Sequence, residues 1–128
     1  MSPKDFDSLV DAAIARIPAR FRRRLRNLVF VVEPEPPQPG LLGLYEGRPL
    51  IHRSVAEPVA MPDRITIYQG PHERFARDGH DLRALVEDTV WHEVAHYFGL
   101  SEQEVLRAER RHEIERAQAL RRLRKGYW

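Results

Sequence analysis

The chain of 128 residues is long enough for one small domain with a modest core and too short for several. It contains no cysteine, which excludes disulfides and thiolate metal sites and is typical of a protein from a reducing compartment. The formal net charge is only +2, and no apolar run approaches the length of a membrane-spanning helix. Because residues 1–5 do not resemble a signal peptide, we expect a cytoplasmic protein with no membrane partner.

The first third of the chain predicts one helix and one buried strand. Apolar residues recur at helical spacing from Phe6 to Ile17, and Pro18 ends the pattern. Residues Asn27–Glu33 form a continuous apolar run of strand length. The proline-rich segment 34–40 cannot be helix or central strand, so it is expected to be a loop.

The middle of the chain predicts further short strands. Residues Leu41–Tyr45 and Arg48–Ile51 are two extended pieces on either side of a Glu-Gly turn. Residues Arg64–Tyr68 alternate and are β-branched, which favours another strand. Residues 71–79, which include His72, are expected to form a polar loop.

A helix is predicted over Asp81–Phe98, with Asp81 as its N-cap and Gly99 as its end. Apolar and aromatic side chains cover most faces of its second half, so that half should be buried. These side chains are Val90, Trp91, Val94, Ala95, Tyr97 and Phe98.

The polar exceptions on this helix are His92, Glu93 and His96. Two imidazoles four residues apart lie one above the other on a helix, which is the geometry for two ligands of one metal ion. Glu93 lies beside such a metal without pointing at it, where it can take a proton from a metal-bound water. Three titratable groups within an apolar wall are costly unless they are paired or bind a metal. The sequence therefore predicts a metal site.

The third ligand is expected from the chain after the helix. Gly99 adopts the left-handed conformation without strain, and the chain reversal there can bring Glu102 to the open side of the metal. Residues Ser101–Glu104 have the form of a capping box, which opens a second helix running to Lys125. Glu102 is the favoured ligand and Glu104 the second candidate, while a solvated carboxylate that favours the helix dipole is the alternative for both.

Together these elements predict an α+β fold, with a sheet of three or four strands packed on the motif helix and a long C-terminal helix. We expect the metal-bearing domain over residues 1–106 and an arginine-rich helical extension over residues 107–128. Arginines cluster in residues 16–26 and 107–125. Such blocks can bind nucleic acid or acidic partners but are more often solvated faces, and few aromatic residues interleave with them. Nucleic acid is not expected as a partner, and the oligomeric state is left open.

The motif and its flanks resemble the minimal zincins, a group of small bacterial proteins in the zincin-like metallopeptidase superfamily. The resemblance covers most of the first 105 residues, including the Leu-Gly-Leu-Tyr-Glu-Gly segment 42–47, the start of a strand at Met61–Ile65 and residues 89–102 around the motif. It implies a shortened zincin fold, a zinc site on the motif helix and peptide or protein substrates. The group usually carries Asp where this chain has Glu102. The only methionines are Met1 and Met61, so no Met-turn follows the motif as it does in metzincins.

The favoured hypothesis is a zinc metallopeptidase. His92, His96 and Glu102 would hold one Zn²⁺ ion in an open three-ligand site, and Glu93 would act as general base. With two imidazoles, one carboxylate and no thiolate, zinc is expected, although Ni²⁺ or Co²⁺ could substitute.

Two further roles are open at this point. Tyr45, Tyr68 and His72 are candidates for the electrophile that stabilises the oxyanion, and nothing in the sequence selects one. The strand Ile65–Tyr68, if it forms a sheet edge over the site, would hold a peptide by adding it as another strand.

Two rival functions come from other classes. One is a metal-dependent ribonuclease, because zincin-like ribosome-associated ribonucleases share two His at this spacing; those enzymes use a third His where this chain has Glu102. The other is a non-catalytic zinc-binding module whose arginine-rich tail is the interaction surface. The residue at position 93 distinguishes them, because only a peptidase depends on a carboxylate there.

Overall fold

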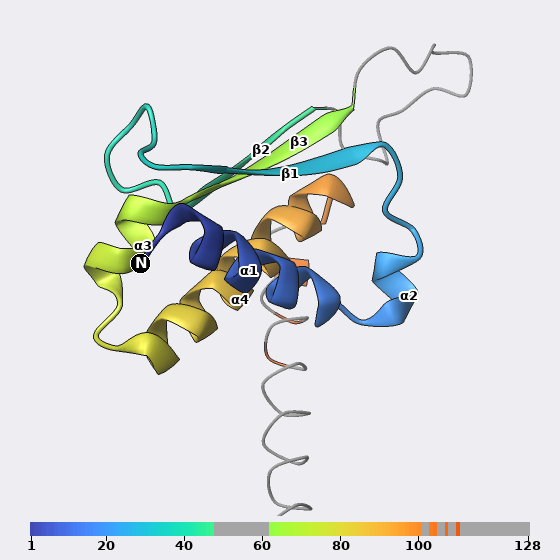
Figure 1. The fold of residues 1–128 in the computed structure, drawn as a ribbon. Helices are drawn as coiled ribbons and strands as arrows, with labels where there is room; N and C mark the ends of the chain where they lie inside the picture. Colours follow the sequence, from blue (N-terminus) through green and yellow to red (C-terminus); the bar gives the residue numbers. More distant parts are fainter. Residues whose placement is uncertain (48–61, 101–102, 105–106, 108–109, 111–128) are drawn as a thin grey trace, which may run out of the picture.

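The computed structural model describes residues 1–47, 62–100, 103–104, 107 and 110. The described elements, in chain order, are α1 (Pro3–Ala15), α2 (Ala19–Arg22), β1 (Leu28–Glu33), β2 (Gly43–Glu46), β3 (Asp63–Tyr68), α3 (Gln69–Phe75) and α4 (Gly79–Tyr97). Figure 1 shows the strands as one layer and the helices α1 and α4 together on one side of it. Residues 103, 104, 107 and 110 are also helical, as expected for a second helix after the motif. The predicted α+β class is confirmed.

The three described strands form one mixed sheet in the order β1-β3-β2. β1 pairs with β3 in parallel, and β2 pairs with β3 in the antiparallel direction. The strand Ile65–Tyr68 therefore lies in the centre of this sheet, so it cannot accept a peptide as an added strand. Its side chains are buried on both faces from Ile65 onward, which is the pattern of a central strand. The edge next to α4 is β2.

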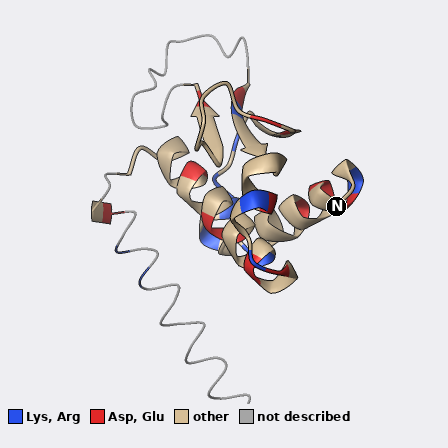
Figure 2. Cartoon of the chain, turned by 90° about the vertical axis from the view of Figure 1, so that its left-hand side faces the viewer, with Lys and Arg blue, Asp and Glu red and all other residues tan. Residues whose placement is uncertain are grey.

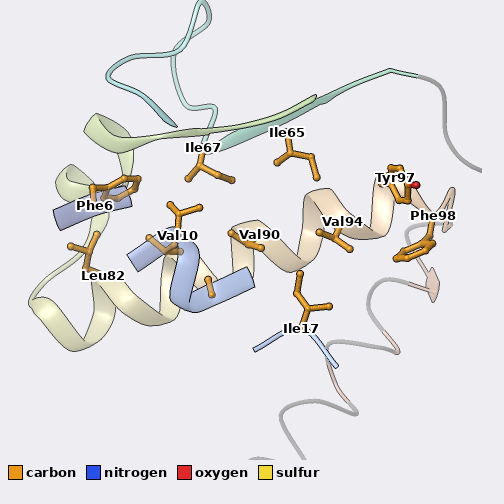
Figure 3. Packing of buried hydrophobic residues seen from close by; sticks show 12 residues of the cluster. Phe6, Val10, Ile17, Ile65, Ile67, Leu82, Val90, Val94, Tyr97 and Phe98 are labelled. Atoms are coloured by element: carbon orange, nitrogen blue, oxygen red, sulfur yellow. The ribbon is translucent and has the colours of Figure 1, made fainter. Parts of the chain in front are cut away.

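The core lies between the sheet and the two long helices. Ile65 and Ile67 project from β3 toward α1 and α4 (Figure 3), and both are fully buried. Pro18 ends the first helical pattern, and Ile17 just before it still reaches the core. The buried cluster from the helices and the segments that flank them comprises Phe6, Val10, Ala13, Ile17, Leu82, Val86, Val90, Val94, Tyr97 and Phe98.

The motif helix begins earlier than the sequence predicts. Its N-cap is Asp78, whose carboxylate accepts a hydrogen bond from the backbone of Asp81 at 2.9 Å. The Asp81 carboxylate instead binds the guanidinium of Arg77 at 2.6 Å. Two acids three residues apart both suit the first turn of a helix, and the ion pair with Arg77 decides which one caps it.

The expected polar loop over residues 71–79 is wrong in its first half, because α3 occupies Gln69–Phe75. Gly70 and Pro71 favour a loop in the sequence, yet a proline in the first helical turn loses no hydrogen bond. Pro71 and His72 are buried in this short helix. The four-residue helix α2 is likewise absent from the prediction, and the extended piece expected at Arg48–Ile51 lies outside the described residues. Within the described part of the chain, no helix is long and apolar enough to cross a membrane.

Tyr97 ties the end of α4 to the segment before β1. Its side chain is fully buried. Its hydroxyl donates to the carbonyl of Arg26 at 3.0 Å and accepts from the backbone N–H of the same residue at 3.1 Å. One phenol thus satisfies both backbone groups of a residue 71 positions away.

We expect Tyr97→Phe to lower the free energy of unfolding by about 1–3 kcal/mol, because it removes both hydrogen bonds and keeps the ring. Urea unfolding followed by circular dichroism measures the change. An unaltered midpoint and slope would mean that water replaces the hydroxyl without cost.

Candidate metal centre

The motif helix ends in a turn that depends on one glycine. Gly99 has a φ of 73°, in the left-handed region that glycine adopts without strain. Its N–H donates to the carbonyl of His96 at 2.9 Å, and the N–H of Leu100 donates to that of Ala95 at 3.1 Å. These two bonds form a Schellman motif, which reverses the chain immediately after the second histidine. The predicted end of the helix at Gly99 is confirmed.

His92, Glu93 and His96 lie together on α4. Each offers one ligand atom, and these atoms all lie within 4.8 Å of one another. The two imidazole ring centres are 4.8 Å apart with an interplanar angle of 76°. Both histidines are half-buried, whereas Glu93 is only 8% exposed. Two imidazole nitrogens are donors that suit Zn²⁺, and a carboxylate beside them suits a metal-bound water, so the residues present fit a zinc site.

The edge strand lies directly over this cluster at Gly43. A Cβ atom at Gly43 would lie 2.8 Å from Cγ2 of Thr89 and 3.1 Å from Cγ of Glu93. Both distances are shorter than an ordinary contact, so only a glycine lets the backbone of β2 approach α4 so closely. The Glu93 side chain is consequently enclosed between the helix and the edge of the sheet.

Sequence reasoning missed the role of Gly43, although a signal was present. An isolated glycine at the start of a strand often marks a close approach of another element. Thr89 was also missed; a threonine one turn before Glu93 carries no motif of its own.

The two candidates for the third ligand follow the turn at Gly99. Glu102 lies outside the described residues, and Glu104 is exposed and helical. The Schellman motif at Gly99 ends the helix before either glutamate. The selection of Glu102 over Glu104 stays a prediction.

Two of the three candidates for the oxyanion electrophile are already engaged. Both ring nitrogens of His72 are hydrogen-bonded inside the protein and its side chain is fully buried. The Tyr45 hydroxyl donates to the Asp63 carboxylate at 2.7 Å. Tyr68 shares a strand face with Thr66, opposite to the face of Ile65 and Ile67 that packs on the helices. The electrostatic effect of Glu93 on the pKa of Tyr68, a minor contribution beside burial, places that phenol within range of the cluster, and the choice among the three candidates stays a prediction.

The buried His72 joins α3 to the helix of the metal cluster. Its Nδ1–H donates to the carbonyl of Tyr68 at 2.6 Å, and its Nε2 lies 2.9 Å from the hydroxyl of Thr89. Burial lowers the pKa of His72, against the opposing effect of its bond to the Tyr68 carbonyl. In the neutral imidazole with a proton on Nδ1, Nε2 is an acceptor. The Thr89 hydroxyl has one proton, and it lies 2.9 Å both from Nε2 and from the carbonyl of Leu85, so the two acceptors share it.

A helix that carries His-Glu-x-x-His beside the edge of a small mixed sheet defines the chain as a zincin-like protein. The sequence profile of the zincin-like metallopeptidases matches residues 25–112, and the chain belongs to this family. The resemblance noted in the sequence is thus confirmed.

A solved structure is also similar to this chain. It is a conserved hypothetical protein from T. thermophilus, with 29% sequence identity and a TM-score of 0.53. The similarity covers 77% of this chain and 94% of the other. No curated protein matches the chain.

The lowered pKa of His72 predicts a pH dependence of stability. In the unfolded chain the imidazole has its ordinary pKa near 6.5, so below that pH the unfolded state binds a proton that the folded state does not. This contribution to stability is present above pH 6.5 and is lost as the pH falls toward the lower pKa of the folded state. One such group gives a slope of at most about 1.4 kcal/mol per pH unit.

The test is the free energy of unfolding between pH 5 and pH 8 for the wild type, His72→Gln and the exposed-site control His80→Gln. We expect His72→Gln to be less stable and to show a shallower fall on acidification, while His80→Gln follows the wild type. Parallel curves for all three proteins would show that His72 keeps its ordinary pKa when folded.

Proposed function

We propose that the protein is a zinc-dependent metallopeptidase. The observation that carries the proposal is the cluster of His92, Glu93 and His96 on one helix of a chain that belongs to the zincin-like family. The hydrolysis of a peptide bond needs an activated water, a polarised carbonyl and a group that moves a proton. The two histidines can hold a metal ion that activates the water and polarises the carbonyl, and Glu93 can move the proton.

His92, His96 and Glu102 would hold the ion. When bound, Zn²⁺ lowers the pKa of a water molecule to about 7 and polarises the carbonyl of the scissile bond. The two histidines are half-buried on one face of α4, which leaves them reachable from solvent. A third ligand after the turn at Gly99 would complete an open three-ligand site.

Glu93 would be the general base. Its carboxylate lies beside the histidine nitrogens, within 4.8 Å, and is enclosed by the backbone of β2 at Gly43. A side chain held in this way has few rotamers and little water around it, which favours a preorganised base. Glu93 would take a proton from the attacking water and deliver it to the leaving amine.

The edge of β2 would bind the substrate backbone. In the described sheet β2 is the edge strand beside α4, and an edge strand is the place where an extended peptide can be added to a sheet. Its first residue, Gly43, lies directly over Glu93. A peptide added there as a strand would run past the metal cluster, and this role replaces the one expected for Ile65–Tyr68.

The ligand set predicts how variants bind zinc. By calorimetry, His92→Ala and His96→Ala should lose most zinc affinity, and Glu102→Gln should weaken it by about one to two orders of magnitude. Glu104→Gln is the matched control. It should lower only the free energy of unfolding, by about 0.5–1 kcal/mol, because it weakens helix capping. Wild-type affinity in either histidine variant would contradict the site, and the reverse order of the two glutamates would make Glu104 the ligand.

The role of Glu93 predicts a variant that binds zinc without turnover. Glu93→Gln keeps the size of the side chain and removes the base, so fold and zinc content should persist while turnover falls by about 10²–10⁴-fold. The measurement is digestion of a peptide library by the zinc-loaded proteins, scored by mass spectrometry.

Equal cleavage by wild type and Glu93→Gln would contradict the mechanism. If both proteins bind zinc and neither cleaves any peptide, the non-catalytic module becomes the better interpretation. Cleavage of RNA instead of peptides would favour the ribonuclease.

A further inference from the structure

The short helix α2 and the residues after it carry an unusual concentration of positive charge. Five arginines and no acidic residue fall within residues 19–26. Arg22 is used structurally, because its guanidinium donates to the carbonyl of Ala15 at the end of α1. The other four, all exposed, are called the α2 arginine surface: Arg20, Arg23, Arg24 and Arg26.

The charge of this surface is not neutralised within the described part of the chain. The neighbouring Arg16 is paired with Glu87 at 2.6 Å, and the exposed Arg64, Arg74 and Arg77 each have an acidic partner. No such ion pair joins the α2 arginine surface to an acid among the described residues. By contrast, the helix that begins at the N-terminus carries both signs of charge (Figure 2).

The surface is also held in place by the rest of the fold. Phe21 packs edge-on against Trp91 at 5.2 Å between ring centres and lies 5.7 Å from Phe98. The guanidinium of Arg20 lies over the ring of Phe21, and that of Arg24 lies over Phe98. A guanidinium above a ring keeps its N–H edges for other partners. Arg20 and Arg24 are therefore prearranged, so their binding of a ligand costs less conformational entropy than binding by a solvated tail would.

We infer that the α2 arginine surface binds an acidic polypeptide segment. Guanidinium groups pair with carboxylates through two parallel hydrogen bonds, and several exposed cations on one rigid surface suit a short run of Asp and Glu. Nucleic acid fits less well. The rings of Phe21 and Phe98 are turned inward under arginines, so this surface offers no open aromatic face for bases, and α2 is too short to serve as a recognition helix.

The surface is separate from the metal cluster but lies on the same end of α4. Phe98 follows His96 by two residues, which is about 200° around a helix, so the arginine above it lies on the opposite side from the histidines. Tyr97 connects the two places, because it lies next to His96 in the chain and binds the backbone of Arg26. An acidic segment bound here would be held near the site without occupying it.

The test measures binding by fluorescence anisotropy, with the metal-free full chain and a labelled twelve-residue peptide that alternates Glu and Ser. Arg23→Gln/Arg26→Gln removes two charges from the surface, and neither side chain has a hydrogen bond within the described residues. Lys4→Gln/Arg83→Gln is the matched control, because it removes the same charge from exposed positions on α1 and α4. Thermal unfolding establishes that both variants fold.

We expect saturable binding that weakens with added salt, on the order of tenfold weaker binding in Arg23→Gln/Arg26→Gln, and a change of less than about twofold in the control. The Gln analogue of the peptide should not bind.

Equal losses of affinity in both variants, or no saturable binding by the wild type, would overturn the inference. Tighter binding of a twelve-nucleotide single strand or duplex would overturn it in favour of nucleic acid. Since the readout involves neither zinc nor hydrolysis, its failure is distinguishable from failure of the proposed peptidase activity.

Discussion

The close approach of the edge strand to the motif helix at Gly43 is the contact on which the site depends. With no side chain there, the backbone of β2 lies against Thr89 and Glu93, and any Cβ would have to displace one of them. The contact encloses the side chain of Glu93 between α4 and the edge strand of the described sheet. Packing in the core then fixes the helix itself, because Val86, Val90 and Val94 are fully buried under the sheet.

In the proposed peptidase, this arrangement would separate the two requirements of a hydrolytic metal site. A general base works best when it is rigid and poorly hydrated, whereas ligands must leave room for water and substrate. On α4 these needs are met by neighbouring positions, with Glu93 turned toward the sheet and His92 and His96 turned toward the half-exposed face. Because adjacent helical residues differ by about 100° in direction, the motif achieves both within five residues.

The sequence predicts the motif helix well because every local signal agrees there: apolar residues cover most of its faces, Gly99 ends it and an acid begins it. Prediction from the sequence fails at the two places where local signals compete, the start of the motif helix and the start of α3. Asp78 and Asp81 are both suitable caps, and the choice is made by Arg77. Gly70 and Pro71 favour a loop, yet they begin α3 because the buried His72 finds partners on Tyr68 and Thr89. The order of the strands depends on contacts between distant segments, so local patterns do not predict it. β3 is central although it is the last of the described strands in the chain.

Tyr97 shows how the metal cluster is linked to a surface outside it. The residue next to the second histidine satisfies the backbone of Arg26, and its ring packs edge-on against Tyr45 of the edge strand at 6.2 Å. The end of α4 is thereby joined both to β2 and to the segment that carries the α2 arginines. The α2 arginines lie on the other side of the helix from the histidines. A ligand bound to them could therefore affect the site only through packed groups such as Tyr97. Through Tyr97, the segment that carries the α2 arginines and the helix of the metal cluster are thus packed into one unit.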